Sequence, residues 1–202
     1  PQNFGGGHKG QMTFVEAFAQ SRNVPFVRIA QDVGMGQVLR AAKDLGVTSS
    51  VRNDLSSALG SSEVSMMEMT RAYAAVSNGG QVVKPFGILR IRTREGTLLY
   101  ERPRERHPYT LNADEVSGLH HLLSAAVTRS DATGRKAYVG IVSGGKTGTT
   151  QNLRDIWFIG YAGGVTTAVW LGNDDNASMK GVTGGGLPAI LWHDYMKQAL
   201  RL

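Results

Sequence analysis

The sequence predicts an α+β, or mixed α/β, fold in which helices flank an antiparallel sheet. Segments with helical spacing of apolar residues occupy much of the chain before residue 127. Three segments rich in β-branched and aromatic residues follow at 138–148, 156–162 and 165–172, separated by short glycine or aspartate turns. Connections this short favour antiparallel pairing. A helical segment from 188 to 199 closes the chain, so we expect helices packed on one sheet.

The first helix is predicted from a capping box. Thr13 is followed by Glu16, and this pair typically begins a helix. The helix is expected to end near 21–23, because Pro25 disfavours helical geometry in the residue before it. Proline is well placed in a first turn, so a second helix is predicted to begin at Pro25 and to reach Gly34.

The remaining elements before the sheet are predicted from periodicity and turn residues. Ser65 and Glu68 form a second capping box. Met66 and Met69 recur at helical spacing behind it, which predicts a buried methionine-rich face. Trp170, in the last strand, is likewise predicted to lie in the core. The further predicted elements are helices at 38–45, 65–77 and 114–126 and a β-hairpin at 88–100.

Composition indicates an ordinary globular chain. Its 202 residues are 41% hydrophobic and 19% charged, which suits a single domain over residues 1–202. No run of about 18 apolar residues predicts a membrane-spanning helix. The absence of cysteine excludes disulfides and thiolate chemistry. The histidines lack ligand-spaced partners, so neither a metal nor a cofactor is expected.

The net charge of +6 does not by itself indicate a nucleic-acid partner. The basic residues are scattered along the chain, and the densest run is Arg102, Arg104 and Arg106. Pro103 and Glu105 interrupt that run, which is typical of a solvated loop. We therefore expect no nucleic-acid partner.

Candidate chemistry is concentrated at residues 144–150, Gly-Gly-Lys-Thr-Gly-Thr-Thr. A lysine flanked by hydroxyls and glycines suits a carboxylate or phosphate ligand. With Gly140, the segment also matches the P-loop pattern literally. A P-loop leads into a helix, however, whereas Lys146 is followed by further β-rich sequence, so this interpretation is set aside.

A second candidate is Ser21-Arg22-Asn23 at the predicted helix break. Alone, a serine and an asparagine at a helix end indicate capping. A Ser-x-Asn motif followed by Lys-Thr-Gly on a strand forms two of the three motifs shared by penicillin-binding proteins and serine β-lactamases.

The flanking residues make the resemblance more specific. Nearly the whole chain resembles the C-terminal portion of the transpeptidase domain of class A, bifunctional penicillin-binding proteins, with its motifs in the expected order. The matching segments are 21–27, 70–80, 134–137, 145–150, 155–161 and 169–175. The resemblance implies a serine β-lactamase/transpeptidase-like fold that is incomplete at the N-terminal side.

The resemblance also implies a reaction. In the family a serine attacks the penultimate D-Ala carbonyl of a peptidoglycan stem peptide and releases the terminal D-Ala. The acyl group is then transferred from the serine to an amine of a neighbouring strand, which forms the cross-link. By this resemblance, Ser21 relays a proton to the leaving group. Asn23 holds the substrate amide, and Lys146 supplies positive field as the third catalytic residue.

The substrate-binding residues implied by the resemblance are Thr147, Gly148 and Thr149. The two hydroxyls are expected to bind the substrate carboxylate. The Thr149 backbone N–H is expected to be one of two oxyanion donors, a contribution of about 3–4 kcal/mol to the barrier.

The sequence departs from the family pattern at its first motif. The Ser-x-x-Lys motif should precede Ser21, yet residues 1–20 contain no serine. The one formal match, Ser143 to Lys146, shares its lysine with Lys-Thr-Gly and is not expected to lie on a helix. We therefore expect a truncated chain that lacks the nucleophile and the family's glycosyltransferase domain and is inactive alone. A natural non-catalytic homologue is the other explanation.

Two functions of different class follow from these observations. One is a transpeptidase-derived enzyme domain that acts on stem peptides and is inhibited by β-lactams. The other is a non-catalytic module that binds peptidoglycan or a partner protein, and a β-lactamase is a weaker third candidate. The parent protein is expected to be membrane-anchored on the periplasmic, extracytoplasmic side, with cell-wall synthesis proteins as further partners.

Overall fold

The computed structural model describes residues 3, 10–105 and 107–202. Its helices are α1 (Phe14–Ala19), α2 (Asn23–Val33), α3 (Met35–Asp44), α4 (Met66–Ser77), α5 (Ala113–Thr128) and α6 (Leu187–Leu200), with short 3-10 helices η1 (Leu55–Leu59), η2 (Arg135–Ala137) and η3 (Gln151–Leu153). Its strands are β1 (Arg90–Arg92), β2 (Leu98–Glu101), β3 (Ser143–Thr149), β4 (Asp155–Ala162) and β5 (Val165–Gly172).

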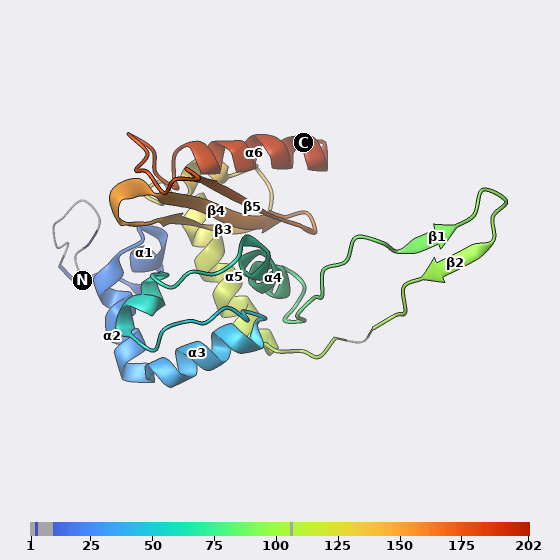
Figure 1. Cartoon of the computed structure of the whole chain (residues 1–202). Coiled ribbons are helices and arrows are strands. Elements are labelled where there is room, and N and C mark those ends of the chain that lie inside the picture. The colour runs from blue at the N-terminus through green and yellow to red at the C-terminus, as the bar shows by residue number, and fades with distance from the viewer. Residues whose placement is uncertain (1–2, 4–9, 106) are drawn as a thin grey trace.

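The central sheet has the strand order β3-β4-β5, and both pairings are antiparallel. Helix α6 covers one face, while α4 and α5 pack on the other (Figure 1). Buried residues fill the space between the sheet and α6, among them Phe158, Trp192 and Met196. The predicted α+β architecture of helices flanking an antiparallel sheet is confirmed.

Two of the differences between observed and predicted element boundaries concern the strand and the helix that carry predicted site residues. Strand β3 begins at Ser143 rather than 138, because Gly140 takes a φ of +87°, which interrupts extended geometry. Helix α2 begins at Asn23, two residues before the predicted start. Pro25 is tolerated there because the first-turn N–H groups of a helix have no intrahelical partner.

Both predicted capping boxes are present. The Thr13 and Ser65 side chains each accept a hydrogen bond from the backbone N–H three residues on, and Glu16 and Glu68 return the bond. Helix α5 begins with a third capping box, formed by Asn112.

Two predictions of buried side chains are wrong. Met66 is 41% exposed, and it is the first residue of α4. Trp170 is 37% exposed on β5, an edge strand of the sheet, and its indole N–H donates to the Asp155 carboxylate at 3.0 Å. Periodicity and residue type did not reveal which faces remain uncovered.

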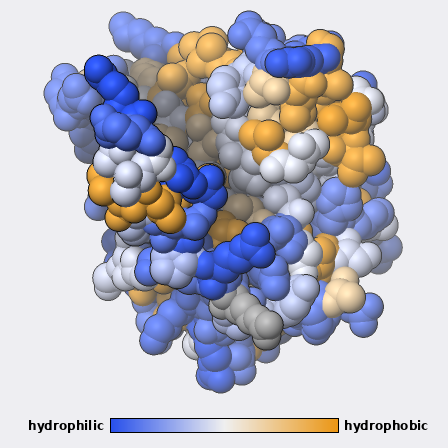
Figure 2. Space-filling view, turned by 90° about the vertical axis from the view of Figure 1, so that its right-hand side faces the viewer, coloured by the Kyte–Doolittle hydropathy of each residue, from blue (hydrophilic) through white to orange (hydrophobic). Residues whose placement is uncertain are grey.

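Strands β1 and β2 form the predicted hairpin, which extends from the body as an arm (Figure 1). Every residue of the two strands is exposed. On the face from which the arm extends, hydrophobic and hydrophilic groups are interspersed (Figure 2). Within the described ranges, no helix has the length and apolar character needed to cross a bilayer.

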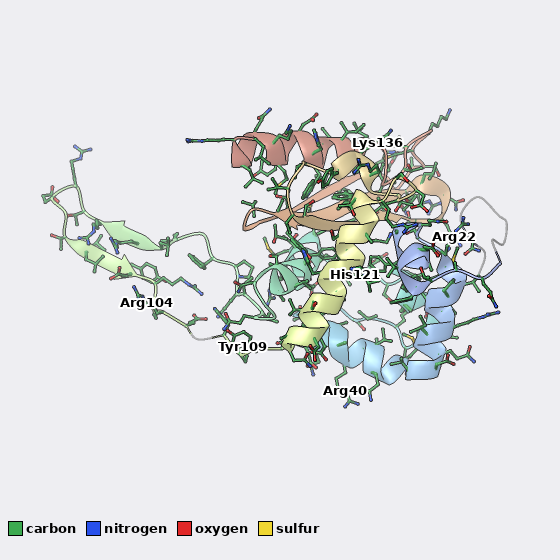
Figure 3. The ribbon with its side chains drawn as sticks, turned by 180° about the vertical axis from the view of Figure 1, so that it is seen from behind. Arg22, Arg40, Arg104, Tyr109, His121 and Lys136 are labelled. Carbon is green, nitrogen blue, oxygen red and sulfur yellow. The ribbon has the colours of Figure 1, made fainter. Side chains whose placement is uncertain are left out.

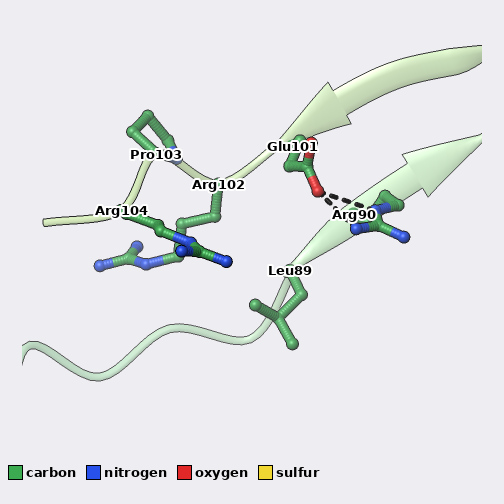
Figure 4. Close-up of a pocket in the computed structure, with 6 residues that line it drawn as sticks. All are labelled: Leu89, Arg90, Glu101, Arg102, Pro103 and Arg104. Carbon is green, nitrogen blue, oxygen red and sulfur yellow. Dashed lines mark hydrogen bonds and ion pairs between the residues drawn. The ribbon is translucent and has the colours of Figure 1, made fainter.

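An open recess lies at the base of this arm (Figure 4), with its lining formed by Leu89, Arg90, Glu101, Arg102, Pro103 and Arg104. Arg90 pairs with Glu101, and Arg102 lies 4.1 Å from the centroid of the Phe86 ring. Arg106, the third arginine of the predicted basic run, lies outside the described residues. The recess contains none of the predicted site residues.

Glu68 joins the loop after α3 to the start of α4. Its buried carboxylate accepts hydrogen bonds of 2.5–2.9 Å from backbone N–H and hydroxyl groups of Thr48, Ser49 and Ser65. The hydroxyls of Ser49 and Thr48, followed by the backbone donors, hold the pKa of this carboxyl well below its usual range. The ionised form of Glu68 therefore stabilises this corner of the fold.

We expect Glu68→Gln to lower the urea midpoint of unfolding. The glutamine NH₂ group would face the backbone N–H and hydroxyl donors that the Glu68 carboxylate accepts from, so some of these hydrogen bonds would be lost. Since folding lowers the pKa of Glu68, its stabilisation is fully present above pH 4.5, the ordinary value, and is lost as the pH falls toward the lower folded-state pKa. The difference between wild type and variant should therefore shrink from pH 7 to pH 3. Glu63→Gln, at an exposed position, is the control. A constant difference would contradict this role.

Candidate active site

Lys146 and Ser21, 125 residues apart in sequence, lie together in the fold. Lys146 is partly buried on β3, and its Nζ donates a hydrogen bond to Ser21 Oγ. The same ammonium donates to the carbonyl oxygen of Thr147 at 3.2 Å and to Thr147 Oγ1 at 3.3 Å. The predicted lysine and serine therefore share one site.

Burial lowers the pKa of Lys146 from 10.5 to about 8, because fewer water molecules solvate its ammonium. The Phe18 ring lies 5.8 Å from Nζ and presents its face to the cation. Lys146 thus combines a positive charge near neutral pH with a proton that is more readily lost than that of an exposed lysine.

The backbone at the end of α1 positions Ser21. Its N–H donates to Phe18 O at 3.0 Å, and the Arg22 N–H donates to Ala17 O at 2.9 Å. These two bonds form a Schellman motif, in which glycine usually takes the left-handed position. Here Ser21 takes it, with a φ of +56°. Serine in this unfavourable conformation is the type of local strain that occurs at functional sites.

Asn23 is the first residue of α2, directly after this turn. Its backbone N–H donates to Asn3 Oδ1 at 3.0 Å, and Val24 N–H reaches the same oxygen at 3.4 Å. The α2 N-terminus is therefore capped by a residue 20 positions upstream. The sequence pattern contained no local signal for this cap.

Thr147 and Thr149 continue the site along β3, and each hydroxyl has a partner from outside the strand. Thr147 Oγ1 lies 2.9 Å from Thr133 Oγ1. Thr149 Oγ1 accepts the Gly184 N–H at 3.0 Å, while the residue itself remains exposed. Thr133 and Gly184 were not predicted, because nothing in their local sequence indicates contact with β3.

Gly148 lies between the two threonines, where β3 pairs with β4. A Cβ at this position would lie 3.2 Å from the Trp157 Cβ, closer than side chains normally pack. Glycine therefore keeps this part of β3 close to Trp157. Seen from behind, α5 crosses this side of the sheet from near Tyr109 past His121 toward Lys136 (Figure 3).

The loop before α6 packs directly on this strand. A Cβ on Gly184 would lie 2.5 Å from Gly148 O and 2.6 Å from Trp157 O, and both of these atoms belong to backbone. We expect Gly184→Ala to cost about 1–3 kcal/mol of unfolding free energy, measured by urea denaturation. Gly118→Ala is the control, because a Cβ at this position in α5 would meet open space, and it should be neutral or stabilising. Equal effects would contradict close packing at Gly184.

Two other interpretations of the sequence around Lys146, a P-loop and a Ser-x-x-Lys motif, do not fit the structure. Lys146 lies within β3, and the strand does not lead into a helix of P-loop type, since η3 spans only Gln151–Leu153. Ser143 and Lys146 are three residues apart on one strand, so their side chains point to opposite faces. Ser143 is also only 1% exposed. The formal Ser-x-x-Lys match is therefore not a nucleophile–lysine pair.

Comparison with known sequences identifies the family. The family described as penicillin-binding protein transpeptidase domain matches residues 2–186. Penicillin-binding protein 1A of Neisseria meningitidis serogroup B is 31% identical over 207 residues, covering 100% of this chain and 26% of that protein. The Aquifex aeolicus protein of the same name is 33% identical over 203 residues, covering 100% and 28%. The chain thus spans about a quarter of the length of these relatives.

Solved structures show the same fold. Penicillin-binding protein 1A of Haemophilus influenzae has a TM-score of 0.89 at 24% identity, covering 99% of this chain and 36% of that one. PonA1 of Mycobacterium tuberculosis has a TM-score of 0.86 at 24% identity, covering 100% and 59%. A second PonA1 structure, in complex with penicillin V, has a TM-score of 0.81 at 23% identity, covering 99% and 59%. The chain belongs to the transpeptidase-domain family of penicillin-binding proteins, and its resemblance to the class A members is confirmed.

Proposed function

We propose that this chain supplies the Ser-x-Asn and Lys-Thr-Gly parts of a D-Ala-D-Ala transpeptidase site, which cross-links peptidoglycan by serine acyl transfer and binds β-lactams. The observation that carries the proposal is the hydrogen bond from Lys146 Nζ to Ser21 Oγ. This bond brings together the Ser-x-Asn and Lys-Thr-Gly motifs, neither of which indicates a transpeptidase site when taken alone. The family and its penicillin V complex support the ligand class.

The family resemblance gives each of the three proposed catalytic residues a role, and the contact between Lys146 and Ser21 supports two of these roles. Ser21 accepts a hydrogen bond from Lys146, so its own proton is available for transfer to the leaving amine. Lys146 provides positive charge beside that hydroxyl and the substrate carboxylate. Asn23, two residues after Ser21, holds the substrate amide.

The strand residues bind the C-terminal end of the substrate. The Thr147 and Thr149 hydroxyls both lie on β3, with Thr147 Oγ1 3.3 Å from the Lys146 ammonium, and hydroxyl donors of this kind suit a carboxylate. Gly148 keeps the intervening backbone free of a side chain. The Thr149 N–H serves as one oxyanion donor, at the point where negative charge develops during acyl transfer.

The acylated serine is not part of this chain in our proposal. Residues 1–20 contain no serine, and Ser143 is buried on the opposite face of β3 from Lys146. We infer that the isolated chain does not form an acyl-enzyme. The active protein is longer, anchored in the membrane, and acts on stem peptides on the extracytoplasmic, periplasmic side together with cell-wall synthesis proteins. Residues 1–202 form a portion of its transpeptidase domain.

One alternative is a module that binds peptidoglycan peptide or a partner protein without chemistry, since Ser143, which has the Ser-x-x-Lys spacing, is only 1% exposed. Both functions allow the chain to bind stem peptide, and they differ in whether the longer protein becomes acylated. Binding is therefore tested first, and acylation separately.

The binding test is an NMR titration of the chain with an acylated D-Ala-D-Ala dipeptide and with its C-terminal amide. We expect the carboxylate form to bind at least about tenfold more tightly, since charge-assisted hydrogen bonds are lost in the amide. Shifts should centre on β3 and the α1–α2 turn. Equal affinity for the two ligands, or no binding, would overturn the proposal.

A further inference from the structure

Thr133 connects the two halves of the site. It lies in the loop between α5 and η2, and its backbone N–H donates to Ala19 O at 2.9 Å, at the end of α1. Its Oγ1 lies 2.9 Å from Thr147 Oγ1 and 3.3 Å from the same Ala19 carbonyl oxygen. One half-buried residue therefore contacts both the helix that leads into Ser21 and the strand that carries Lys146.

The Thr133 hydroxyl has one proton and two acceptors within reach. In one arrangement it donates to Ala19 O and accepts the Thr147 proton. In the other it donates to Thr147 Oγ1, which already accepts from Lys146 Nζ at 3.3 Å. In both arrangements Ala19 O still accepts a hydrogen bond from the Thr133 N–H, so this carbonyl always has a donor.

The two arrangements differ in where the Thr147 proton points. In the first it is used within the protein. In the second both lone pairs of Thr147 Oγ1 are occupied, by Lys146 and Thr133, so its proton is directed away from both donors. The Thr149 hydroxyl differs from that of Thr147. Its oxygen accepts a hydrogen bond from the Gly184 N–H, and this bond does not use the hydroxyl proton.

We propose that Thr133 is a positioning residue that turns the Thr147 hydroxyl from an internal donor into a donor to the ligand carboxylate. This inference rests on the proposed function and extends it to a residue outside the three motifs. A carboxylate has only acceptor atoms, so its arrival favours the arrangement in which Thr133 donates to Thr147 and Thr147 donates to the ligand. Thr133 does not contact the ligand itself.

The test compares Thr133→Val with Thr133→Ser in the same NMR titration. Valine keeps the β-branched shape and the backbone N–H but removes the hydroxyl, and serine keeps the hydroxyl. Without the second donor, Thr147 Oγ1 is free to rotate and loses its preorganised direction. We expect Thr133→Val to reduce the ratio of carboxylate to amide affinity about threefold to tenfold. Thr133→Ser should retain the wild-type ratio within about twofold.

The ratio separates positioning from a loss of structure. If Thr133 only stabilised the fold, Thr133→Val would weaken both ligands equally and leave the ratio unchanged, which would overturn the inference. A raised ratio in Thr133→Val, or a lowered ratio in Thr133→Ser, would overturn it as well. If wild type already shows no preference for the carboxylate, the proposed function fails, and this inference fails with it. A wild-type preference that stays undiminished in Thr133→Val refutes the inference alone.

Discussion

Replacing Lys146 by methionine is expected to remove the preference of the chain for carboxylate-terminated peptides, with a loss of about tenfold or more in affinity. Methionine fills a similar volume but carries no charge and donates no hydrogen bond to Ser21 or Thr147. Lys136→Met removes an equal charge from an exposed position in η2 and should leave the affinity within about twofold of wild type. Equal losses in the two variants would contradict a specific role for Lys146.

The pH dependence of binding should follow from the same residue. Burial lowers the pKa of Lys146 to about 8, so the ammonium is charged below that pH and loses its proton above it. Carboxylate affinity should therefore be highest below pH 8 and fall at higher pH, while amide affinity stays nearly constant. Between pH 8 and 10.5 the unfolded chain binds more protons than the folded one, so this lysine makes folding more favourable as the pH rises there. A carboxylate affinity that stays constant up to pH 10 would contradict the role of the Lys146 ammonium in binding the ligand.

The largest expected effect on stability comes from Phe158→Ala. Phe158 is 0% exposed, and its ring centroid lies 5.2 Å from that of Trp192 in an edge-on contact between the sheet and α6. Truncating a buried phenylalanine costs about 3–5 kcal/mol of unfolding free energy. The ring also packs under Gly145, beside Lys146 on β3, so the cavity lies directly below the site.

The matched control for this variant is Leu99→Ala in the arm. Leu99 is 64% exposed, and its truncation should change the unfolding free energy by no more than about 0.5 kcal/mol. Urea denaturation of both variants measures the difference. A cost for Phe158→Ala as small as that for Leu99→Ala would show that the sheet and α6 do not share one core.

Local sequence rules account for much of the fold. The capping boxes at Thr13 and Ser65 begin helices where predicted, because their hydrogen bonds join residues only three positions apart. The β-rich segments formed the antiparallel sheet, since short turns leave few other pairings. What these rules did not predict is which faces stay uncovered, as the exposure of Met66 and Trp170 shows.

The candidate site was only partly predictable for a related reason. Ser21, Asn23 and the Lys-Thr-Gly strand belong to motifs that are visible in the sequence. The contacts of Thr133 with Ala19 and Thr147, and of Gly184 with Thr149, join separate segments through single hydrogen bonds. Asn3 caps α2 in the same way. Such contacts depend on how the elements pack, so no periodicity or spacing predicts them.

The central claim, that this chain holds the binding and relay residues but not the acylated serine, is tested most directly by intact-protein mass spectrometry after incubation with benzylpenicillin. PonA1 of M. tuberculosis, known in complex with penicillin V, serves as the positive control and should gain the mass of one drug molecule. We predict no mass increase for the 202-residue chain. An increase by one drug mass on this chain would contradict the claim and show that one of its own residues acts as the nucleophile.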